Sequence, residues 1–192
     1  MSCTVAVPKP RRKCPRPLQL PTEAVVDQPP SPVRLPIREI FPGLLISGYS
    51  SATDAGLLQT HRVTHILNLA GDAQCPNLFP DRFVYRTVKL TDSPDFQLTS
   101  CYAEVLQFIH AARSAGGRVL VHCAMGKSRA PSIGCAYAMW ALNLSATEAF
   151  ALIQQKQKLI EPNLGFIAQL QELSGCSPAW TSAWPVVSVK SV

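Results

Sequence analysis

The stretch GGRVLVHCAMGKSRAPSIGCAYAMWAL, residues 116–142, decides the fold of this chain. Its first part, RVLVH (118–122), has an apolar centre with two β-branched valines, which is typical of a short buried strand. Its last part, residues 129–142, is apolar and long enough to indicate a helix packed in a core. The loop HCAMGKSR (122–129) joins them and holds a histidine, a cysteine, a glycine, a serine and an arginine. In open α/β sheets, ligands bind where strands end in this way.

Strands and helices alternate along the rest of the chain as well. The hydrophobic patterns predict strands at GLLIS (43–47), VTHILNLA (63–70) and RFVYRTVKL (82–90), and helices over 51–61, 98–115, 145–161 and 163–173. The alternation predicts an α/β fold, in which a central, mostly parallel sheet is flanked by helices on both faces.

Several helix ends carry recognisable signals. We expect Ser51 or Thr53 to cap the helix over 51–61. Ser145 and Glu148 form a capping box at the start of the helix that follows residue 145, and Pro162 is expected to end that helix. These signals support the assignment of helices at both places.

Composition divides the chain into three regions. The 192 residues are 47% apolar, which is enough for one domain with a substantial core. Nine of the 17 prolines lie in residues 1–38, where they oppose helix and central strand. We therefore predict a flexible, Pro-rich basic arm over 1–37, a folded domain over 38–175 and a C-terminal tail over 176–192.

The arm also carries most of the net charge of +6, with 7 Lys/Arg against 3 Asp/Glu in residues 1–40. Because the basic residues are concentrated in this arm, we expect no nucleic-acid partner. The cluster suits an acidic partner, a membrane surface or nuclear import, and a solvated tail is an equally simple interpretation. The basic cluster consists of Lys9, Arg11, Arg12, Lys13 and Arg16.

The seven cysteines are odd in number and irregularly spaced, and the first 20 residues lack the apolar core of a secretion signal. We therefore expect reduced thiols in a cytoplasmic protein, with the nucleus as an additional location. The cysteine spacing also predicts no metal site. Cys75 or Cys101 is a candidate disulfide partner for Cys123 on oxidation, and the spacing leaves that pairing open.

The loop after the strand has the composition of an anion site. A helix N-terminus presents backbone N–H groups that lack partners inside the helix, and its dipole is positive. Gly126 lets the backbone curl around a ligand, and Arg129 adds a planar fork that matches two phosphate oxygens. The same environment is expected to lower the pKa of Cys123, which makes its sulfur a nucleophile beneath a bound oxyanion.

The loop has the form H-C-x-x-G-x-S-R and resembles the signature of cysteine-dependent dual-specificity protein phosphatases. Further pieces are similar to that family in the same order: IFPGLLISG, THILNLAGD, LTDSPDF and EPNLGFIAQL. The chain resembles the small type without a kinase-docking domain. The resemblance implies the cysteine-phosphatase fold and hydrolysis of phosphotyrosine and phosphoserine/threonine through a phosphocysteine intermediate. It implies neither a metal nor any other cofactor.

The resemblance also implies a general acid, because an ester oxygen leaves poorly unless it is protonated. The family places the acid at the first aspartate of a loop such as LTDSPDF, which is Asp92 in this chain. Asp92 would protonate the leaving group and then activate water as a base. Asp95 is the second choice, and its simpler role is to shape the loop or cap the helix over 98–115.

The other implied roles lie within the signature loop. Cys123 is the nucleophile, and Arg129 binds the phosphate and stabilises the transition state. Ser128 is expected to hydrogen-bond the Cys123 sulfur and help it leave, while His122 orients the loop from behind. The substrate-binding residues are Ala124, Met125, Gly126, Lys127, Ser128 and Arg129.

The substrate is expected to be a phosphorylated protein, but two alternatives stay open at this point. One is phosphoinositide or another non-protein phosphate, which Lys127 beside the pocket suits, although a solvent-facing lysine is the simpler interpretation. The other is a phosphate-binding pseudophosphatase scaffold, which the presence of both Cys123 and Arg129 disfavours. The physiological substrate and the oligomeric state are not encoded in these motifs.

Overall fold

The structure is a computed structural model that describes residues 35–175. The basic cluster predicted for the arm and the predicted tail over 176–192 lie outside the described residues. Leu35 and Ile37 stand on the arm side of the predicted boundary, yet both are buried. The packed region therefore includes residues before 38.

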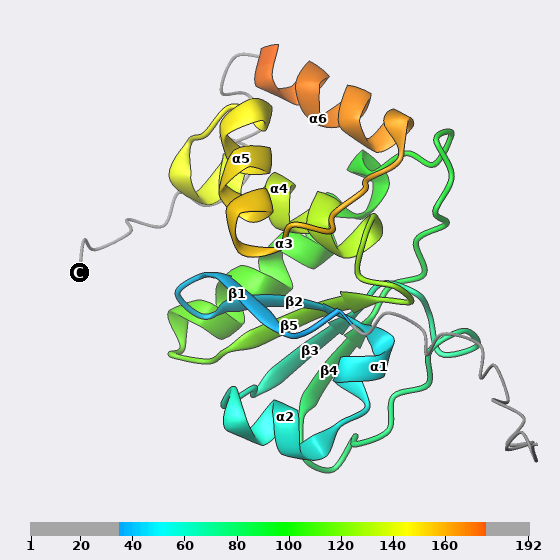
Figure 1. The fold of residues 1–192 in the computed structure, drawn as a ribbon, viewed down its shortest axis with the longest axis vertical. Coiled ribbons are helices and arrows are strands. Elements are labelled where there is room, and N and C mark those ends of the chain that lie inside the picture. The colour runs from blue at the N-terminus through cyan, green and yellow to red at the C-terminus, as the bar shows by residue number, and fades with distance from the viewer. Residues whose placement is uncertain (1–34, 176–192) are drawn as a thin grey trace, which may run out of the picture. The chain divides into compact units, whose positions relative to one another are not determined.

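Within residues 35–175, five strands form one sheet in the order β1-β2-β5-β3-β4 (Figure 1). β1 runs antiparallel to β2, and the other neighbours are parallel, which confirms the predicted mostly parallel sheet. The strands are β1 (Arg38–Phe41), β2 (Leu44–Gly48), β3 (His65–Asn68), β4 (Val84–Thr87) and β5 (Val119–Cys123).

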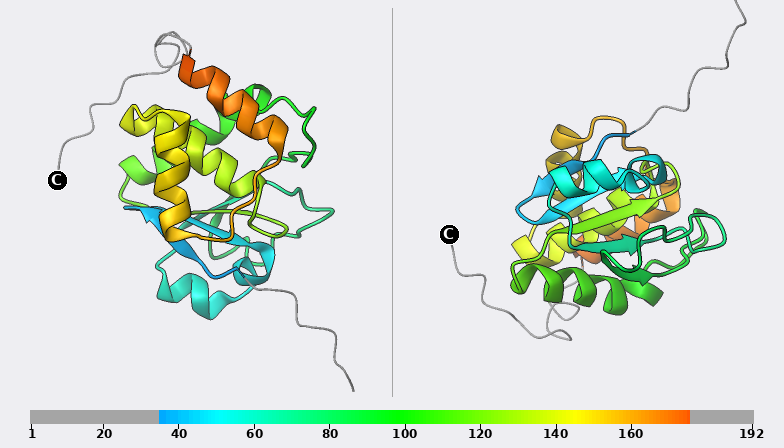
Figure 2. Two further views of the ribbon diagram at one scale, coloured as in Figure 1. Left: turned by 45° about the horizontal axis from the view of Figure 1, so that its top comes forward. Right: turned by 90° about the horizontal axis from the view of Figure 1, so that it is seen from below.

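Helices cover both faces of the sheet, as predicted (Figures 1 and 2). One face carries α1 (Tyr49–Ala52) and α2 (Ala55–Thr60), and the other carries α3 (Thr99–Ser114), α4 (Arg129–Leu142), α5 (Ala146–Lys156) and α6 (Leu164–Gly175). In the described part of the chain, no helix combines the length and the apolar character needed to cross a membrane.

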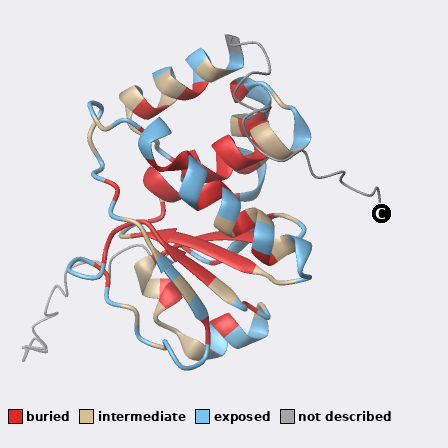
Figure 3. Cartoon of the chain, turned by 180° about the vertical axis from the view of Figure 1, so that it is seen from behind, coloured by how far each residue is buried: buried red, intermediate tan, exposed pale blue. Residues whose placement is uncertain are grey.

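Alternation along the strands divides the core between the two faces. Leu44, Ile46 and Val121 pack with α3 to α6, whereas Leu45 and Leu120 pack in a second cluster with α1 and α2. The central strands are therefore buried on both sides, as Figure 3 shows by their red colour. Such strands are apolar throughout, which is why they stand out in the sequence.

Several predicted elements are confirmed at or near their expected bounds. The helix over 129–142 is α4, and the helix over 98–115 is α3. The capping box is present, since Ser145 Oγ accepts a hydrogen bond from Glu148 N and the Glu148 side chain accepts one from Ser145 N. Asn163 begins α6, because its Oδ1 accepts a hydrogen bond from Phe166 N at 2.9 Å.

The prediction for residues 51–61 is wrong in two respects. The segment forms two short helices, and the cap of α2 is Asp54, whose Oδ1 accepts a hydrogen bond from Leu57 N at 3.0 Å. Ser51 Oγ instead donates to Leu35 O at 2.7 Å, and Thr53 Oγ1 donates to Ser50 O at 3.0 Å. Only Asp54 has an extended backbone directly before α2, which places its carboxylate ahead of the first free N–H groups.

Two further differences from the prediction are the end of α5 and the presence of β1. α5 ends at Lys156, well before Pro162, because Gln157 takes an extended backbone and donates its side-chain amide to Pro36 O at 3.3 Å. β1 was not predicted, because its burial does not alternate and its first two residues are exposed. β1 is a strand because its backbone pairs with β2, although its side chains do not show the alternation of a strand.

Candidate active site

The signature loop, residues 122–129, runs from the end of β5 into the start of α4 and packs against the end of β2. Tyr49 N donates a hydrogen bond to Ala124 O at 3.0 Å. Gly126 has φ +78°, and a Cβ there would lie 2.5 Å from Gly48 N. Only glycine suits this close approach of two backbones, so the predicted role of Gly126 in curling the loop has a steric basis.

The Cys123 side chain lies at the base of this loop and is 1% exposed. Its sulfur accepts a hydrogen bond from Gly126 N at 3.2 Å. The backbone of the loop therefore turns a donor inward and holds the sulfur in one place, as a nucleophile requires.

Arg129 is buried, with 6% exposure, and its guanidinium is held from one side. Nη1 donates to Gln74 Oε1 and to Leu90 O, both at 3.2 Å. Nε has no hydrogen-bond partner among the described residues. A buried donor without a partner is costly unless a ligand satisfies it, so this nitrogen suits a phosphoryl oxygen.

Gln74 was missed by the sequence analysis. It lies in an exposed loop after Gly71-Asp72, a pair of residues typical of a turn, and no motif points to it. Its contact with Arg129 spans 55 positions of the chain, so only the fold reveals it.

Asp92 meets the signature loop from the loop that follows β4. Its Oδ1 accepts hydrogen bonds from Ser128 Oγ at 2.6 Å and from Asn163 Nδ2 at 2.9 Å. Its Oδ2 lies 3.5 Å from Arg129 Nε. The structure therefore brings together the predicted acid and the predicted phosphate-binding arginine.

Of the two structural roles considered for Asp95, the structure contradicts the helix cap. α3 is preceded by Leu98, which has no side-chain cap, and Leu98 N donates to Gln169 Oε1 at 2.8 Å. The alternative that Asp95 caps α3 is wrong, because the glutamine of α6 occupies that position. The backbone N–H of Asp95 instead lies 3.4 Å from Ser93 Oγ, as in a local turn.

The predicted contact between Ser128 and the Cys123 sulfur is wrong in this structure. Ser128 Oγ donates to Asp92 instead, and it accepts a hydrogen bond from Asn163 N at 3.3 Å. A carboxylate oxygen is a stronger acceptor than sulfur, and the fold places one within reach. Ser128 is therefore a partner of the acid.

His122 is 2% exposed, and its ring lies beside that of Tyr49, with 5.8 Å between the centroids. Burial lowers the pKa of His122 to about 4, because the surroundings disfavour the charged ring. The ring is neutral near pH 7. This agrees with an orienting role behind the loop rather than proton transfer.

Lys127 forms an ion pair with Glu161 at 3.0 Å. The two side chains are 28% and 69% exposed, so this is a surface ion pair, and Lys127 does not present an unpaired charge to a ligand. Met125 is the most exposed residue of the signature loop, at 66%. The rim of the site is thus less basic than the sequence of the loop suggests.

Asn68 braces the segment that carries Gln74. Its Oδ1 accepts a hydrogen bond from Ala70 N at 3.0 Å, and its Nδ2 donates to Cys75 O at 2.7 Å. Cys75 is buried, and burial raises its thiol pKa. Its thiol and those of Cys101, Cys123 and Cys135 are free, and a pairing of Cys123 on oxidation stays a prediction.

A surface pocket opens beside Arg129 and Asp92. Residues 70–74, Thr87 and residues 89–91 line it together with these two side chains. Among the residues that the structure describes, no three His, Cys, Asp or Glu side chains gather as metal ligands would.

Known proteins are similar to this chain in sequence and in fold. The family "Dual specificity phosphatase, catalytic domain" matches residues 44–175. The chain is 41% identical to human "Protein phosphatase Slingshot homolog 3" over 136 residues, which are 71% of this chain and 20% of that relative. It is 37% identical to "Dual specificity protein phosphatase 1" of Arabidopsis thaliana over 68% of this chain and 65% of the relative. The chain therefore spans about a fifth of the length of the Slingshot relative that it matches.

A solved structure agrees with the sequence matches. The crystal structure of human "tyrosine phosphatase-like serine/threonine/tyrosine-interacting protein" is similar with a TM-score of 0.68 and 34% identity. The similarity covers 74% of this chain and 97% of that one. Together with the signature loop between β5 and α4, these matches show that the chain belongs to the dual specificity phosphatase family.

Proposed function

We propose that this chain is an active protein phosphatase that hydrolyses phosphotyrosine and phosphoserine/threonine through a phosphocysteine intermediate. One observation carries the proposal: the Arg129 guanidinium, in the loop that holds the Cys123 sulfur, has its buried Nε 3.5 Å from Asp92 Oδ2. A nucleophile, a phosphate-binding group and an acid in one site are what a phosphatase of this kind needs.

In the first step, Cys123 Sγ attacks phosphorus in line and forms an S–P bond while the ester P–O bond breaks. The departing oxygen takes the electron pair of that bond and a proton from Asp92. The N–H groups of the loop and the Arg129 fork hold the three equatorial oxygens, whose charge they match in the transition state.

In the second step, water replaces the sulfur. Asp92, now a carboxylate, takes a proton from the water as its oxygen bonds to phosphorus. The S–P bond breaks and its electron pair returns to Cys123 as thiolate. Inorganic phosphate leaves, and the enzyme returns to its starting protonation state.

Phosphorylated proteins fit the site better than phosphoinositides. The only lysine in the signature loop is Lys127, and its ammonium is already paired with Glu161 at 3.0 Å. A site for a multiply charged inositol headgroup needs free cations at its rim, beyond the arginine that binds the reacting phosphate.

The test compares turnover of phosphotyrosine peptides, phosphoserine/threonine peptides and phosphoinositide vesicles, with Cys123→Ser as the blank. We expect vanadate-sensitive hydrolysis of both peptide classes and none with Cys123→Ser. Turnover of vesicles alone would remove the protein-phosphatase proposal. Phosphate binding without turnover of any substrate would favour a scaffold.

A further inference from the structure

The segment Glu161–Asn163 crosses between the signature loop and the loop that carries Asp92. Glu161 N donates to Lys127 O at 2.7 Å, and Asn163 N donates to Ser128 Oγ at 3.3 Å. Asn163 Nδ2 then reaches Asp92 Oδ1 at 2.9 Å. One short segment therefore holds the phosphate-binding loop with its backbone and the acid with a side chain.

The two ends of the Asn163 amide have different partners. Its Oδ1 accepts a hydrogen bond from Phe166 N at 2.9 Å and so caps α6, while its Nδ2 donates to Asp92. Asparagine is a good cap, but serine and aspartate cap equally well. The cap therefore does not explain why the side chain carries an amide donor, whereas the contact with Asp92 does.

The start of α6 also supports the loop that carries Asp92. Gly165 lies directly against the backbone of Pro94, where a Cβ would collide with it. Gln169 accepts a hydrogen bond from Leu98 N at 2.8 Å and donates one to Phe96 O at 2.9 Å. The loop from Asp92 to Leu98 thus rests on α6, and Asn163 is the point at which this support meets the carboxyl group.

We propose that Asn163 is the positioning residue of the general acid and selects which oxygen of Asp92 carries the proton. This inference rests on the proposed phosphatase function. Oδ1 already accepts hydrogen bonds from Asn163 Nδ2 and Ser128 Oγ, so a proton on Oδ1 would compete with both donors. The proton therefore resides on Oδ2, which faces Arg129 at 3.5 Å.

The proton transfer then runs through a single oxygen of Asp92. As the ester P–O bond breaks, the proton passes from Asp92 Oδ2 to the departing oxygen, and Asp92 becomes a carboxylate. In the second step, Oδ2 takes the proton of the attacking water. Asn163 Nδ2 and Ser128 Oγ stay bonded to Oδ1 throughout, so the carboxyl group need not rotate between the two steps.

The test uses two variants that keep the helix cap, Asn163→Ser and Asn163→Asp, in the full chain. Both lose the amide donor. Turnover of a poor leaving group, a phosphoserine peptide, should fall by roughly tenfold to a hundredfold in kcat, because that oxygen needs its proton. Turnover of p-nitrophenyl phosphate, whose leaving group needs little protonation, should fall by about threefold or less.

Asn163→Asp adds a readout that a structural role would not move. It places a second carboxyl group beside Asp92, which raises the pKa of the acid, so the alkaline limb of kcat/KM should shift to higher pH. Asn163→Ser should shift that limb by less, because it removes one hydrogen bond to the carboxylate and adds no charge. Asn143→Asp is the matched control, because Asn143 is an exposed residue in the left-handed region at the end of α4 and the same change there leaves both substrates unaffected.

The outcomes separate the two proposals. No turnover by the parent chain would overturn the proposed function and this inference with it. An active parent whose Asn163 variants lose both substrates equally would overturn the inference alone, since that pattern reports general damage to the site. Unchanged kcat for the phosphoserine peptide in both cap-preserving variants would overturn it as well.

Discussion

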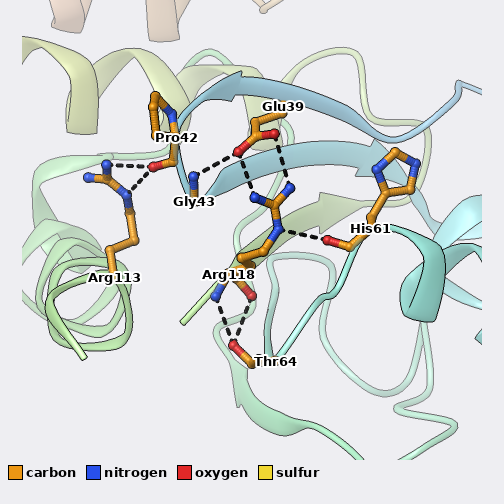
Figure 4. Close-up of polar contacts among 7 residues, drawn as sticks. All are labelled: Glu39, Pro42, Gly43, His61, Thr64, Arg113 and Arg118. Atoms are coloured by element: carbon orange, nitrogen blue, oxygen red, sulfur yellow. Dashed lines mark hydrogen bonds and ion pairs between the residues drawn. The ribbon is translucent and has the colours of Figure 1, made fainter. Parts of the chain in front are cut away.

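Two arginines, one before β5 and one after it, show how differently this fold uses the same side chain. Arg118 precedes the strand, and all three of its guanidinium nitrogens have partners: Nε donates to His61 O at 2.7 Å, and the two terminal nitrogens donate to Glu39 at 2.9 and 3.0 Å (Figure 4). Arg129 follows the strand, and only Nη1 makes hydrogen bonds that the structure describes.

The partners of Arg118 explain its role. Figure 4 shows it between β1, the end of α2 and Thr64, whose Oγ1 accepts a hydrogen bond from Arg118 N at 2.8 Å. Its bidentate contact with Glu39 lowers the pKa of that carboxyl group, since the guanidinium favours the charged form. Arg118 thus joins three segments that are distant in the sequence.

The hydrogen-bond partners of Arg118 and Arg129 distinguish a structural arginine from one that binds a ligand. A guanidinium whose donors are all satisfied by the protein stabilises structure. A buried guanidinium that is anchored on one nitrogen and leaves another without a hydrogen bond is prepared for a ligand. The two ends of β5 therefore differ in what they leave unsatisfied, although both carry an arginine.

The largest expected effect is on catalysis by Arg129. Arg129→Lys should lower kcat/KM for p-nitrophenyl phosphate by roughly a hundredfold to a thousandfold, because one ammonium cannot replace the fork. The free energy of unfolding of this variant should differ from that of the parent by about 1 kcal/mol or less, because the guanidinium that it loses is buried with one unsatisfied donor, and that donor opposes folding. Steady-state kinetics and urea unfolding measure both quantities. A large loss of stability with normal kinetics per folded molecule would erase the contrast with Arg118.

The next effect is a loss of folding stability at low pH, which we expect from the burial of His122. The pKa of His122 is about 4 in the folded chain against 6.5 in the unfolded one. The unfolded state therefore takes up a proton first, so stability is complete above pH 6.5 and falls as the pH drops toward 4. The loss should be on the order of 2 kcal/mol at pH 4.5, and His122→Gln should show a smaller loss. His65→Gln, at the other end of the sheet, is the control, and an equal change there would contradict the special burial of His122.

A smaller effect should follow from changing the anchor of Arg129. Gln74→Glu keeps an oxygen beside Nη1 but adds a negative charge that competes with phosphate for the guanidinium. We expect the inhibition constant of inorganic phosphate to rise about tenfold, or about 1.4 kcal/mol. Gln59→Glu, on the exposed side of α2, makes the same change in charge away from the site. Equal constants for the two variants would show that Gln74 does not hold Arg129.

The smallest effect should come from Glu39. Glu39→Gln removes the charge that pairs with Arg118, and the free energy of unfolding should fall by about 1 kcal/mol or less, because this carboxylate is 38% exposed. The folded pKa of Glu39 lies below 4.5, so its contribution is present above pH 4.5 and is lost as the pH falls through the folded value. Turnover per folded molecule should be unchanged, and a loss of kcat would mean that both arginines serve the site.

The parts of this molecule that were predicted correctly are those with local signals. Apolar runs and the helix pattern located β5, α3 and α4, because each element is recognised from side chains within a few positions of one another. The capping box of α5 is equally local. β1 was missed because it is held by backbone pairing with its antiparallel neighbour β2. The cap of α2 was predicted wrongly because the chain bends at Thr53-Asp54 and the predicted helix is two helices.

The features of the candidate site also separate into those with a local sequence signal and those without one. The sequence by itself determined the loop that joins Cys123 to Arg129, since a glycine between a strand and a helix N-terminus has few other ways to turn. Only the tertiary structure decided that Gln74 anchors the arginine, that Ser128 holds Asp92 rather than the sulfur, and that Asn163 also holds Asp92. Contacts such as that between Asn163 and Asp92, 71 positions apart, depend on where whole elements pack, and no local pattern of residues records that.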